Sequence, residues 1–151
     1  MSEELSHLDE KGRLQMVDVG DKPPVRRVAV AEAMFCAAAP TLDLLLAGEL
    51  PKGEALAAAR VAGILAAKQC DRLIPLCHQL PLDQVSVAFE RIAPDRLRIL
   101  ATVSTTARTG VEMEALTAAS VAALTLWDMT KAVDKALRVD GLRLVRKEKT
   151  P

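Results

Sequence analysis

Two neighbouring stretches with alternating apolar residues place the strongest constraint on how this chain can fold. They run over Val85–Ile92 and Arg96–Thr106, and Pro94 and Asp95 between them indicate a turn. Because successive side chains of a strand point to opposite faces, the alternation predicts two strands joined as an antiparallel hairpin. The apolar face of this hairpin must be covered by another layer of structure. The residues expected on that face are Val85, Val87, Phe89, Leu97, Ile99, Ala101 and Val103.

Helices rich in alanine and leucine can supply the covering layer. The pattern predicts a helix over about Glu54–Leu73, a second over about Glu112–Lys135, and a short helix that begins at Pro40. Half of the 151 residues are hydrophobic but only 2% are aromatic, so the core must consist mainly of small and branched aliphatic side chains. Gly63 costs the first long helix about 1 kcal/mol relative to alanine, which favours close packing at that point.

Two further strands, Arg26–Ala37 and Gly141–Arg146, complete the predicted order strand–helix–helix–strand–strand–helix–strand. This order predicts an α+β fold of the ferredoxin-like, split βαβ type, with an antiparallel sheet covered by helices on one face. We expect one domain over residues 1–151. Within it, residues 1 to about 20 are expected to form an N-terminal arm that would be flexible on its own.

Charge and composition exclude several classes of partner and location. Lys plus Arg equals Asp plus Glu at 20 each, so broad electrostatic binding to nucleic acid or to an anionic membrane is not expected. The polar N-terminus resembles neither a signal peptide nor a transit peptide, and no apolar run reaches the ~18 residues of a membrane span. The three cysteines form no CxxC pair, which favours reduced thiols in a cytoplasmic protein.

A loop with a histidine between two prolines is the first candidate for chemistry. Pro75 and Pro81 stiffen the segment IPLCHQLPL, and His78 at its centre could serve acid–base work or ligand contact. His78 could equally be a structural or surface residue. Cys77 beside it lacks an evident base for a nucleophilic role, and the cysteine spacing does not supply the four ligands of a zinc site.

The two ends of the second long helix carry charged candidates. Its start follows Gly110 and could bind an anion, although Glu112 and Glu114 there also suit the helix dipole without any ligand. Near its end, Asp128 and Lys131 share one face, although lysines are favoured at helix C-termini in any protein. Glu114 and Asp128 lie 14 residues apart, or about 21 Å along a helix, so a site that uses both must be long or combine different subunits.

Basic residues next to turns could together bind a triphosphate, although each alone is more often a solvated surface charge. Residue spacing by itself therefore predicts an α+β domain with a candidate phosphate site, and leaves an enzyme and a non-catalytic domain both open. The basic residues concerned are Lys22, Arg26, Lys52, Lys68, Arg72 and Arg108.

Seven segments, taken in order along the chain, resemble the molybdenum cofactor biosynthesis protein C family, the cyclic pyranopterin monophosphate synthases. TGVEMEALTAASVAALT is long and specific, and the matching segments together cover about Ser6 to Leu144. In order, the segments are SHLDEKG, MVDVGDK, KG, ARVAGILAAK, LIPLCH, TGVEMEALTAASVAALTLWDM and KAVDKAL.

This resemblance implies a ferredoxin-like enzyme that acts as a homo-hexamer, a trimer of dimers with sites at subunit boundaries. It implies conversion of (8S)-3′,8-cyclo-7,8-dihydroguanosine 5′-triphosphate, the product of an upstream radical enzyme, to cyclic pyranopterin monophosphate and pyrophosphate in molybdenum cofactor biosynthesis. No redox cofactor is implied, because oxidation states rearrange within the substrate, and we expect no metal.

The resemblance carries a catalytic role onto Asp128, with Lys52 and Lys131 as further catalytic candidates. It carries substrate contact onto Leu76, Cys77, His78, Met113 and Glu114. Weaker substrate-binding candidates, assigned by charge and segment, are Glu112, Lys22, Arg26, Lys68, Arg108 and Lys135.

The chain departs from the family pattern at Gln79, Trp127 and Thr130, where the family usually has Pro, Tyr and Cys. None of these changes removes an acid, a base or a phosphate-binding residue. An alternative is a non-catalytic oligomer that binds a nucleotide or pterin with the same pocket, and a purely structural oligomer is a third class.

Overall fold

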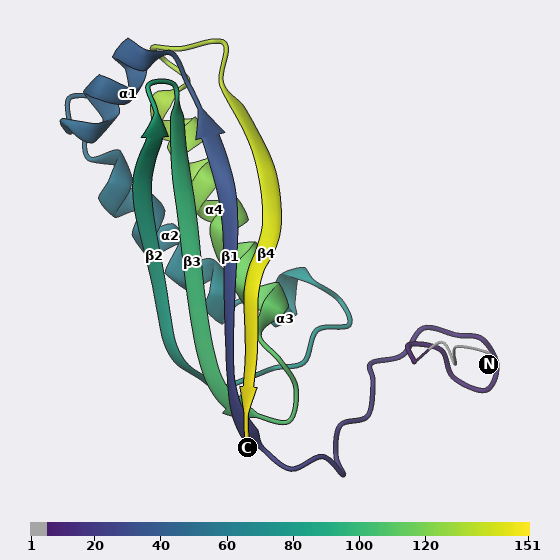
Figure 1. The fold of residues 1–151 in the computed structure, drawn as a ribbon. Helices are drawn as coiled ribbons and strands as arrows, with labels where there is room; N and C mark the ends of the chain where they lie inside the picture. The colour runs from purple at the N-terminus through teal and green to yellow at the C-terminus, as the bar shows by residue number, and fades with distance from the viewer. Residues whose placement is uncertain (1–5) are drawn as a thin grey trace.

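The computed structural model describes residues 6–151 and is built around one four-stranded antiparallel sheet with the strand order β2-β3-β1-β4 (Figure 1). The elements in chain order are β1 (Val25–Cys36), α1 (Ala39–Leu46), α2 (Ala55–Lys68), α3 (Cys70–Leu73), β2 (Leu82–Ala93), β3 (Arg96–Ala107), α4 (Glu112–Thr130) and β4 (Arg138–Thr150).

The expected α+β architecture is confirmed, with the helices on one face of the sheet (Figure 1). The β2–β3 hairpin forms at the predicted place, and Phe89 pairs with Ile99 across it. All four apolar residues expected to point inward from β3 are fully buried, because α4 and α1 pack on this strand. These residues are Leu97, Ile99, Ala101 and Val103.

Gly63 on α2 lies in close contact with both α4 and β2. A Cβ atom added there would stand 3.0 Å from the backbone oxygen of Ala118 on α4 and 3.0 Å from Cγ2 of Val87 on β2. The predicted close packing at this glycine is therefore confirmed. Because the facing residues on α4 are also alanines, with Ala118 and Ala122 fully buried, the two helices approach without large side chains between them.

Several element boundaries differ from the sequence prediction. The first long helix ends at Lys68 rather than Leu73, because Gln69 leaves helical geometry at φ −113° and ψ 12° before the short α3. The second long helix ends at Thr130 rather than Lys135, and β4 runs over Arg138–Thr150 rather than Gly141–Arg146. Pairing with β1 along its length extends this last strand, and such pairing leaves no signal in the local sequence.

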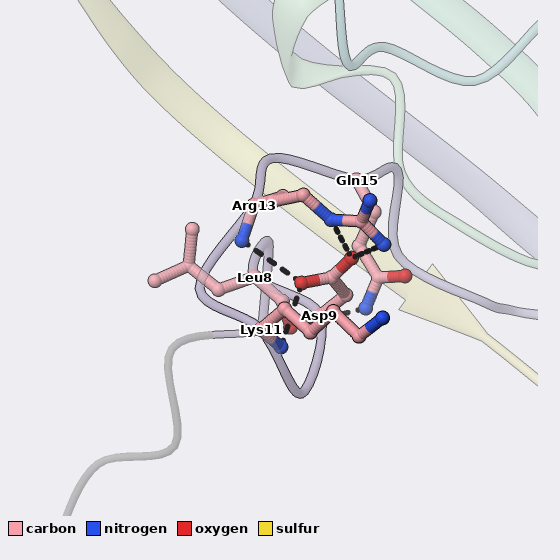
Figure 2. A network of polar contacts seen from close by, with 5 residues as sticks. All are labelled: Leu8, Asp9, Lys11, Arg13 and Gln15. Atoms are coloured by element: carbon pink, nitrogen blue, oxygen red, sulfur yellow. Dashed lines mark hydrogen bonds and ion pairs between the residues drawn. The ribbon is translucent and has the colours of Figure 1, made fainter.

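The N-terminal arm leads into the beginning of β1, and its described part lies away from the sheet (Figure 1). Residues 1–5 of the expected arm lie outside the described residues. In the described part, Asp9 accepts hydrogen bonds from the backbone N–H groups of Lys11 and Arg13, both at 2.9 Å, and forms an ion pair with the Arg13 guanidinium at 2.8 Å (Figure 2). Among the described residues, no helix has both the length and the apolar character needed to cross a membrane.

Candidate active site

A cavity of about 210 Å³ lies where the N-terminal arm meets the loop after α3 and the beginning of α4. These three segments are far apart in the sequence, and they meet because the loop turns back over the N-terminal end of α4. The cavity is lined by His7, Val17, Val19, Lys22, Leu76, Cys77, His78, Leu80, Thr109, Gly110, Glu112, Met113 and Glu114.

His78 joins the loop to the arm. Its Nε2 atom lies 2.6 Å from the backbone oxygen of Val17. A carbonyl oxygen can only accept, so Nε2 must carry the proton, which leaves Nδ1 of the neutral ring as an acceptor. This contact fixes the ring orientation at the cavity wall, and it gives His78 a structural role in addition to the expected substrate contact.

Glu114, in the first turn of α4, is the buried acid of the cavity, with only 3% of its surface exposed. Its Oε1 atom accepts a hydrogen bond from the Cys77 thiol at 3.5 Å, and its Oε2 atom has no partner among the described residues. Burial raises the pKa of Glu114 above its ordinary value, because the charged form loses its water. Glu114 can therefore hold a proton at higher pH than an exposed glutamate and share it with a ligand.

Cys77 does not have the surroundings of a nucleophile. Burial first, and the nearby Glu114 carboxyl second, raise the pKa of the Cys77 thiol well above its ordinary value. Since the thiolate is the reactive form, a thiol with a raised pKa stays protonated and weakly reactive at neutral pH. The chemistry of Cys77 in this structure is that of a hydrogen-bond donor to Glu114.

A second group of candidates lies at the other end of α4, where Lys52, Asp128 and Lys131 meet. Lys131 Nζ lies 2.9 Å from Asp128 Oδ1, and Lys52 Nζ lies 3.1 Å from Asp128 Oδ2. The ion pairs with Lys131 and then Lys52 hold the pKa of Asp128 below its ordinary value. Lys52 reaches Asp128 from the turn between α1 and α2, in which Gly53 adopts a positive φ of 98°. All three side chains are exposed to solvent, so this group is open to a phosphate-bearing ligand.

Of the weaker candidates, Lys22 and Glu112 line the first cavity, and the others lie elsewhere on the surface. Arg26 and Arg108 lie at the same end of the sheet, since Arg26 pairs with Thr106, two residues before Arg108. Lys68 lies apart from the first cavity, beside a shallow hollow of about 330 Å³. Lys135 donates to the backbone oxygen of Lys131 at 2.7 Å and lines another hollow of about 310 Å³ with it.

The sequence-based prediction did not assign roles to several residues that the structure places at the site. His7, Val17 and Val19 of the arm line the cavity, although their segments were noted for their resemblance to the family. Cys70 also lies at the site, and its sulfur is 3.8 Å from that of Cys77. Together, Cys70, Cys77 and Glu114 offer three atoms within 4.8 Å of one another, an arrangement that could hold a metal ion. Because Glu114 is far from the two cysteines in the chain, the sequence alone did not indicate that these three residues meet.

The profile of the MoaC family matches residues 16–150, which include both groups of candidate residues. The chain belongs to the MoaC family. A curated relative from Herpetosiphon aurantiacus, named cyclic pyranopterin monophosphate synthase, is 59% identical over 137 residues, which cover 90% of this chain and 84% of the relative. A protein of the same name from Chloroflexus aggregans is 54% identical and covers 96% of this chain and 88% of the relative.

The MoaC family also occurs as part of a longer protein. A relative from Chlorobaculum tepidum is named molybdenum cofactor biosynthesis bifunctional protein. It is 54% identical over 144 residues, which cover 95% of this chain but 46% of the relative. The family match and these relatives confirm the resemblance to the molybdenum cofactor biosynthesis protein C family that the sequence motifs indicated.

Proposed function

We propose that this chain is a cyclic pyranopterin monophosphate synthase of molybdenum cofactor biosynthesis, a lyase that releases pyrophosphate. Its substrate is (8S)-3′,8-cyclo-7,8-dihydroguanosine 5′-triphosphate. The observation that carries the proposal is Asp128 held between Lys52 and Lys131, at 3.1 and 2.9 Å, in a chain whose relatives bear the name of that enzyme. A carboxylate between two ammonium groups supplies both a proton acceptor and cations for phosphate chemistry.

Lys131 and Lys52 act in phosphate stabilisation and proton transfer. Negative charge develops on the phosphate oxygens as the cyclic phosphate forms and pyrophosphate leaves, and positioned cations stabilise such charge. Asp128 keeps its negative charge at neutral pH because its pKa is lowered by these lysines, so it acts as a base or orients Lys131. Ring opening and closure require repeated proton transfers, which suit a group of two potential acids and one base.

His78 and Glu114 hold the base portion of the substrate at the other end of α4. In the neutral form of His78, Nδ1 can accept a hydrogen bond, because Nε2 donates to the backbone oxygen of Val17. Glu114 Oε2 has no partner among the described residues and accepts from guanine-type N–H groups. At this end of α4, we propose further substrate contacts for Leu76, Cys77, Glu112 and Met113. The basic residues proposed to bind the triphosphate are Lys22, Arg26 and Arg108. Lys68 and Lys135 are proposed as more distant positive charges around the substrate.

The two groups act on one substrate only if subunits combine. Glu114 and Asp128 lie 14 residues apart on α4, or about 21 Å along its axis, which exceeds the reach of one small ligand on one chain. We propose a homo-hexamer, a trimer of dimers, in which one subunit supplies Glu114 and His78 and another supplies Asp128. Exposed apolar side chains, including Leu124 at 62%, Val61 at 56% and Leu142 at 50%, support the burial of further surface in an oligomer.

The proposal includes a cytoplasmic location, a single domain over residues 1–151 and no nucleic-acid or membrane partner. Equal numbers of acidic and basic residues support the absence of a broad electrostatic surface. The proposed partners are the small-molecule substrate and further copies of the chain.

Lys131→Ala tests the catalytic assignment. Purified protein is supplied with the cyclised dihydro-GTP, and pyranopterin and pyrophosphate are followed by mass spectrometry. We expect the variant to lose at least about 100-fold in kcat, because it lacks both a cation for the developing charge and the partner of Asp128. Arg146→Ala is the matched control, since it also removes one exposed cation from an ion pair, with Glu148 at 3.1 Å.

The outcomes separate the three classes of function. Near-normal turnover in Lys131→Ala would contradict the catalytic role of this residue. Tight binding of the substrate without product in the unmodified protein would instead indicate a non-catalytic binding oligomer. A purely structural oligomer would show no binding in a calorimetric titration.

A further inference from the structure

Two thiols and one carboxylate converge beside the candidate substrate cavity. Cys70 begins α3, Cys77 lies in the loop that follows, and Glu114 comes from the first turn of α4. The sulfur atoms of Cys70 and Cys77 are 3.8 Å apart, and Cys77 Sγ lies 3.5 Å from Glu114 Oε1. All three donor atoms lie within 4.8 Å of one another.

These separations match the edges of a tetrahedral zinc site. With Zn–S near 2.3 Å and Zn–O near 2.0–2.2 Å, tetrahedral ligands stand about 3.8 Å apart for two sulfurs and about 3.5 Å apart for a sulfur and an oxygen. The distances of 3.8 Å from Cys70 to Cys77 and 3.5 Å from Cys77 to Glu114 match two of these edges, and the third separation, from Cys70 to Glu114, is within 4.8 Å.

Glu114 supplies an independent sign of a ligand. Only 3% of its surface is exposed, yet its Oε2 atom has no hydrogen-bond partner among the described residues. Leaving such an atom unpaired costs about 1–3 kcal/mol or more for a charged group, so a buried carboxylate of this kind is usually satisfied by a ligand or an ion.

We propose that Cys70, Cys77 and Glu114 form a three-ligand site for a thiophilic divalent cation, Zn²⁺. Two sulfurs and one oxygen favour zinc over magnesium, which takes oxygen ligands and keeps its waters. Each thiol loses its proton to solvent as its sulfur bonds to the ion. Water supplies the fourth ligand of the tetrahedron. Thr117 Oγ1, 3.5 Å from Cys70 Sγ, supports the Cys70 ligand from outside the site.

Zinc at this site excludes the substrate, and this consequence rests on the proposed function. Cys77 and Glu114 belong both to the zinc site and to the wall of the substrate cavity. An ion bonded to these two residues holds the Glu114 carboxylate and occupies the part of the cavity wall against which the base portion of the substrate would lie. Zinc and substrate therefore compete, and the protein is inhibited when the metal occupies the site.

Cobalt titration tests the site without any reference to activity. We expect the purified, reduced chain to bind one Co²⁺ per subunit with a thiolate-to-cobalt charge-transfer band in the near ultraviolet and intense visible bands, both removed by Zn²⁺. Cys70→Ser should weaken binding at least about 10-fold, since mutation around a metal site typically costs 10–100-fold in affinity. Cys36→Ser is the matched control, because Cys36 is also a buried free thiol but contacts Asp140 and Arg138 instead.

Glu114→Gln and thermal melting without metal extend the cobalt titration. Glu114→Gln retains both thiols and should also weaken cobalt binding, and melting curves recorded without metal show whether each variant is folded. The proposal is overturned if the unmodified chain gives no charge-transfer band. It is equally overturned if folded Cys70→Ser binds cobalt as tightly as the unmodified chain, or if Cys36→Ser abolishes the band.

Turnover separates this proposal from the proposed function. One equivalent of Zn²⁺ should inhibit the unmodified chain and Cys36→Ser, whereas Cys70→Ser should need at least about 10-fold more of the ion for the same fractional inhibition. Full turnover of a zinc-loaded chain would overturn the competition. Absence of turnover in every sample would contradict the synthase activity, while the cobalt spectrum would still decide the metal site.

Discussion

At the scale of single residues, Asp134 connects the end of α4 to the beginning of α1. Its Oδ2 atom accepts from the backbone N–H of Ala38 at 3.0 Å and from the Thr41 hydroxyl at 2.9 Å, and its Oδ1 atom accepts from the N–H of Ala136 at 2.9 Å. No side chain of its own sequence segment caps α1, so this distant aspartate satisfies the N–H group at the helix start.

Asp134→Asn should lower the free energy of unfolding by about 1–3 kcal/mol at pH 7, because charge-assisted hydrogen bonds are lost. The N–H groups of Ala38 and then Ala136 hold the pKa of Asp134 below its ordinary value of 3.8. Its stabilisation is therefore present above that value and is lost as the pH falls through the lower pKa of the folded state. Urea unfolding at pH 7, 5 and 3.5 measures the free energy of unfolding of Asp134→Asn and of the unmodified protein. The difference between the two values should become smaller only at pH 3.5.

Asp95→Asn serves as the control, because Asp95 is exposed in the β2–β3 turn. Its effect should stay within about 0.5 kcal/mol at each pH. A gap between Asp134→Asn and the unmodified protein that stays constant down to pH 3.5 would contradict the assigned role of the carboxylate. Protein concentration must be the same throughout, since an oligomer gains stability with concentration.

At the scale of elements, the contact between α2 and α4 positions both groups of candidate site residues. α4 carries Glu114 at its start and Asp128 near its end, and α2 follows the turn that holds Lys52. Alanines and Gly63 line the contact, so the distance between the helices is set by backbone atoms rather than by side chains. A small change at Gly63 therefore moves the helix that carries the site.

Gly63→Val should destabilise the protein by about 1–3 kcal/mol or more, despite the higher helix propensity of valine. The new Cβ would meet the Ala118 backbone oxygen at 3.0 Å, which cannot move away without α4. Ala57→Val, on the exposed side of α2, should cost no more than about 0.7 kcal/mol. Thermal melting of the two variants at one protein concentration measures the difference, and equal melting temperatures would contradict the close packing.

At the scale of the whole molecule, the two groups of candidate residues lie at opposite ends of one helix. The cavity with His78 and Glu114 opens at the start of α4, and the group around Asp128 lies near its end. A helix of this length is rigid, so no loop movement within one subunit brings the two groups together. The arrangement suits a site shared between subunits of the proposed hexamer.

Mixing two inactive variants tests the shared site. His78→Ala and Asp128→Ala damage different groups, so a mixed oligomer contains sites with both groups intact. Random reassembly of equal amounts should restore about one quarter of the normal activity, because each site draws its two halves independently from a symmetric assembly. Native mass spectrometry confirms that the subunits have exchanged. Mixed oligomers without activity would show that both groups act within one chain.

The local pattern of the sequence determined most of the fold. Alternation over Val85–Ile92 and Arg96–Thr106 predicted the hairpin and its buried face, because side-chain direction in a strand follows from backbone geometry alone. The alanine-rich stretches predicted the covering helices for the same reason of local periodicity. The family motifs indicated Lys52, Asp128 and Lys131, and Lys52 and Asp128 are 76 residues apart in the chain.

Only the tertiary structure decided which distant residues meet and where elements end. β4 is longer than predicted because it pairs with β1. α2 ends at Lys68, where Gln69 leaves helical geometry and the chain turns toward α4. That turn brings Cys70 and Cys77 to Glu114, whose burial raises its pKa. Burial, convergence of donor atoms and strand pairing depend on contacts between residues far apart in the chain. Local periodicity carries no information about such contacts, so these features had to await the folded structure.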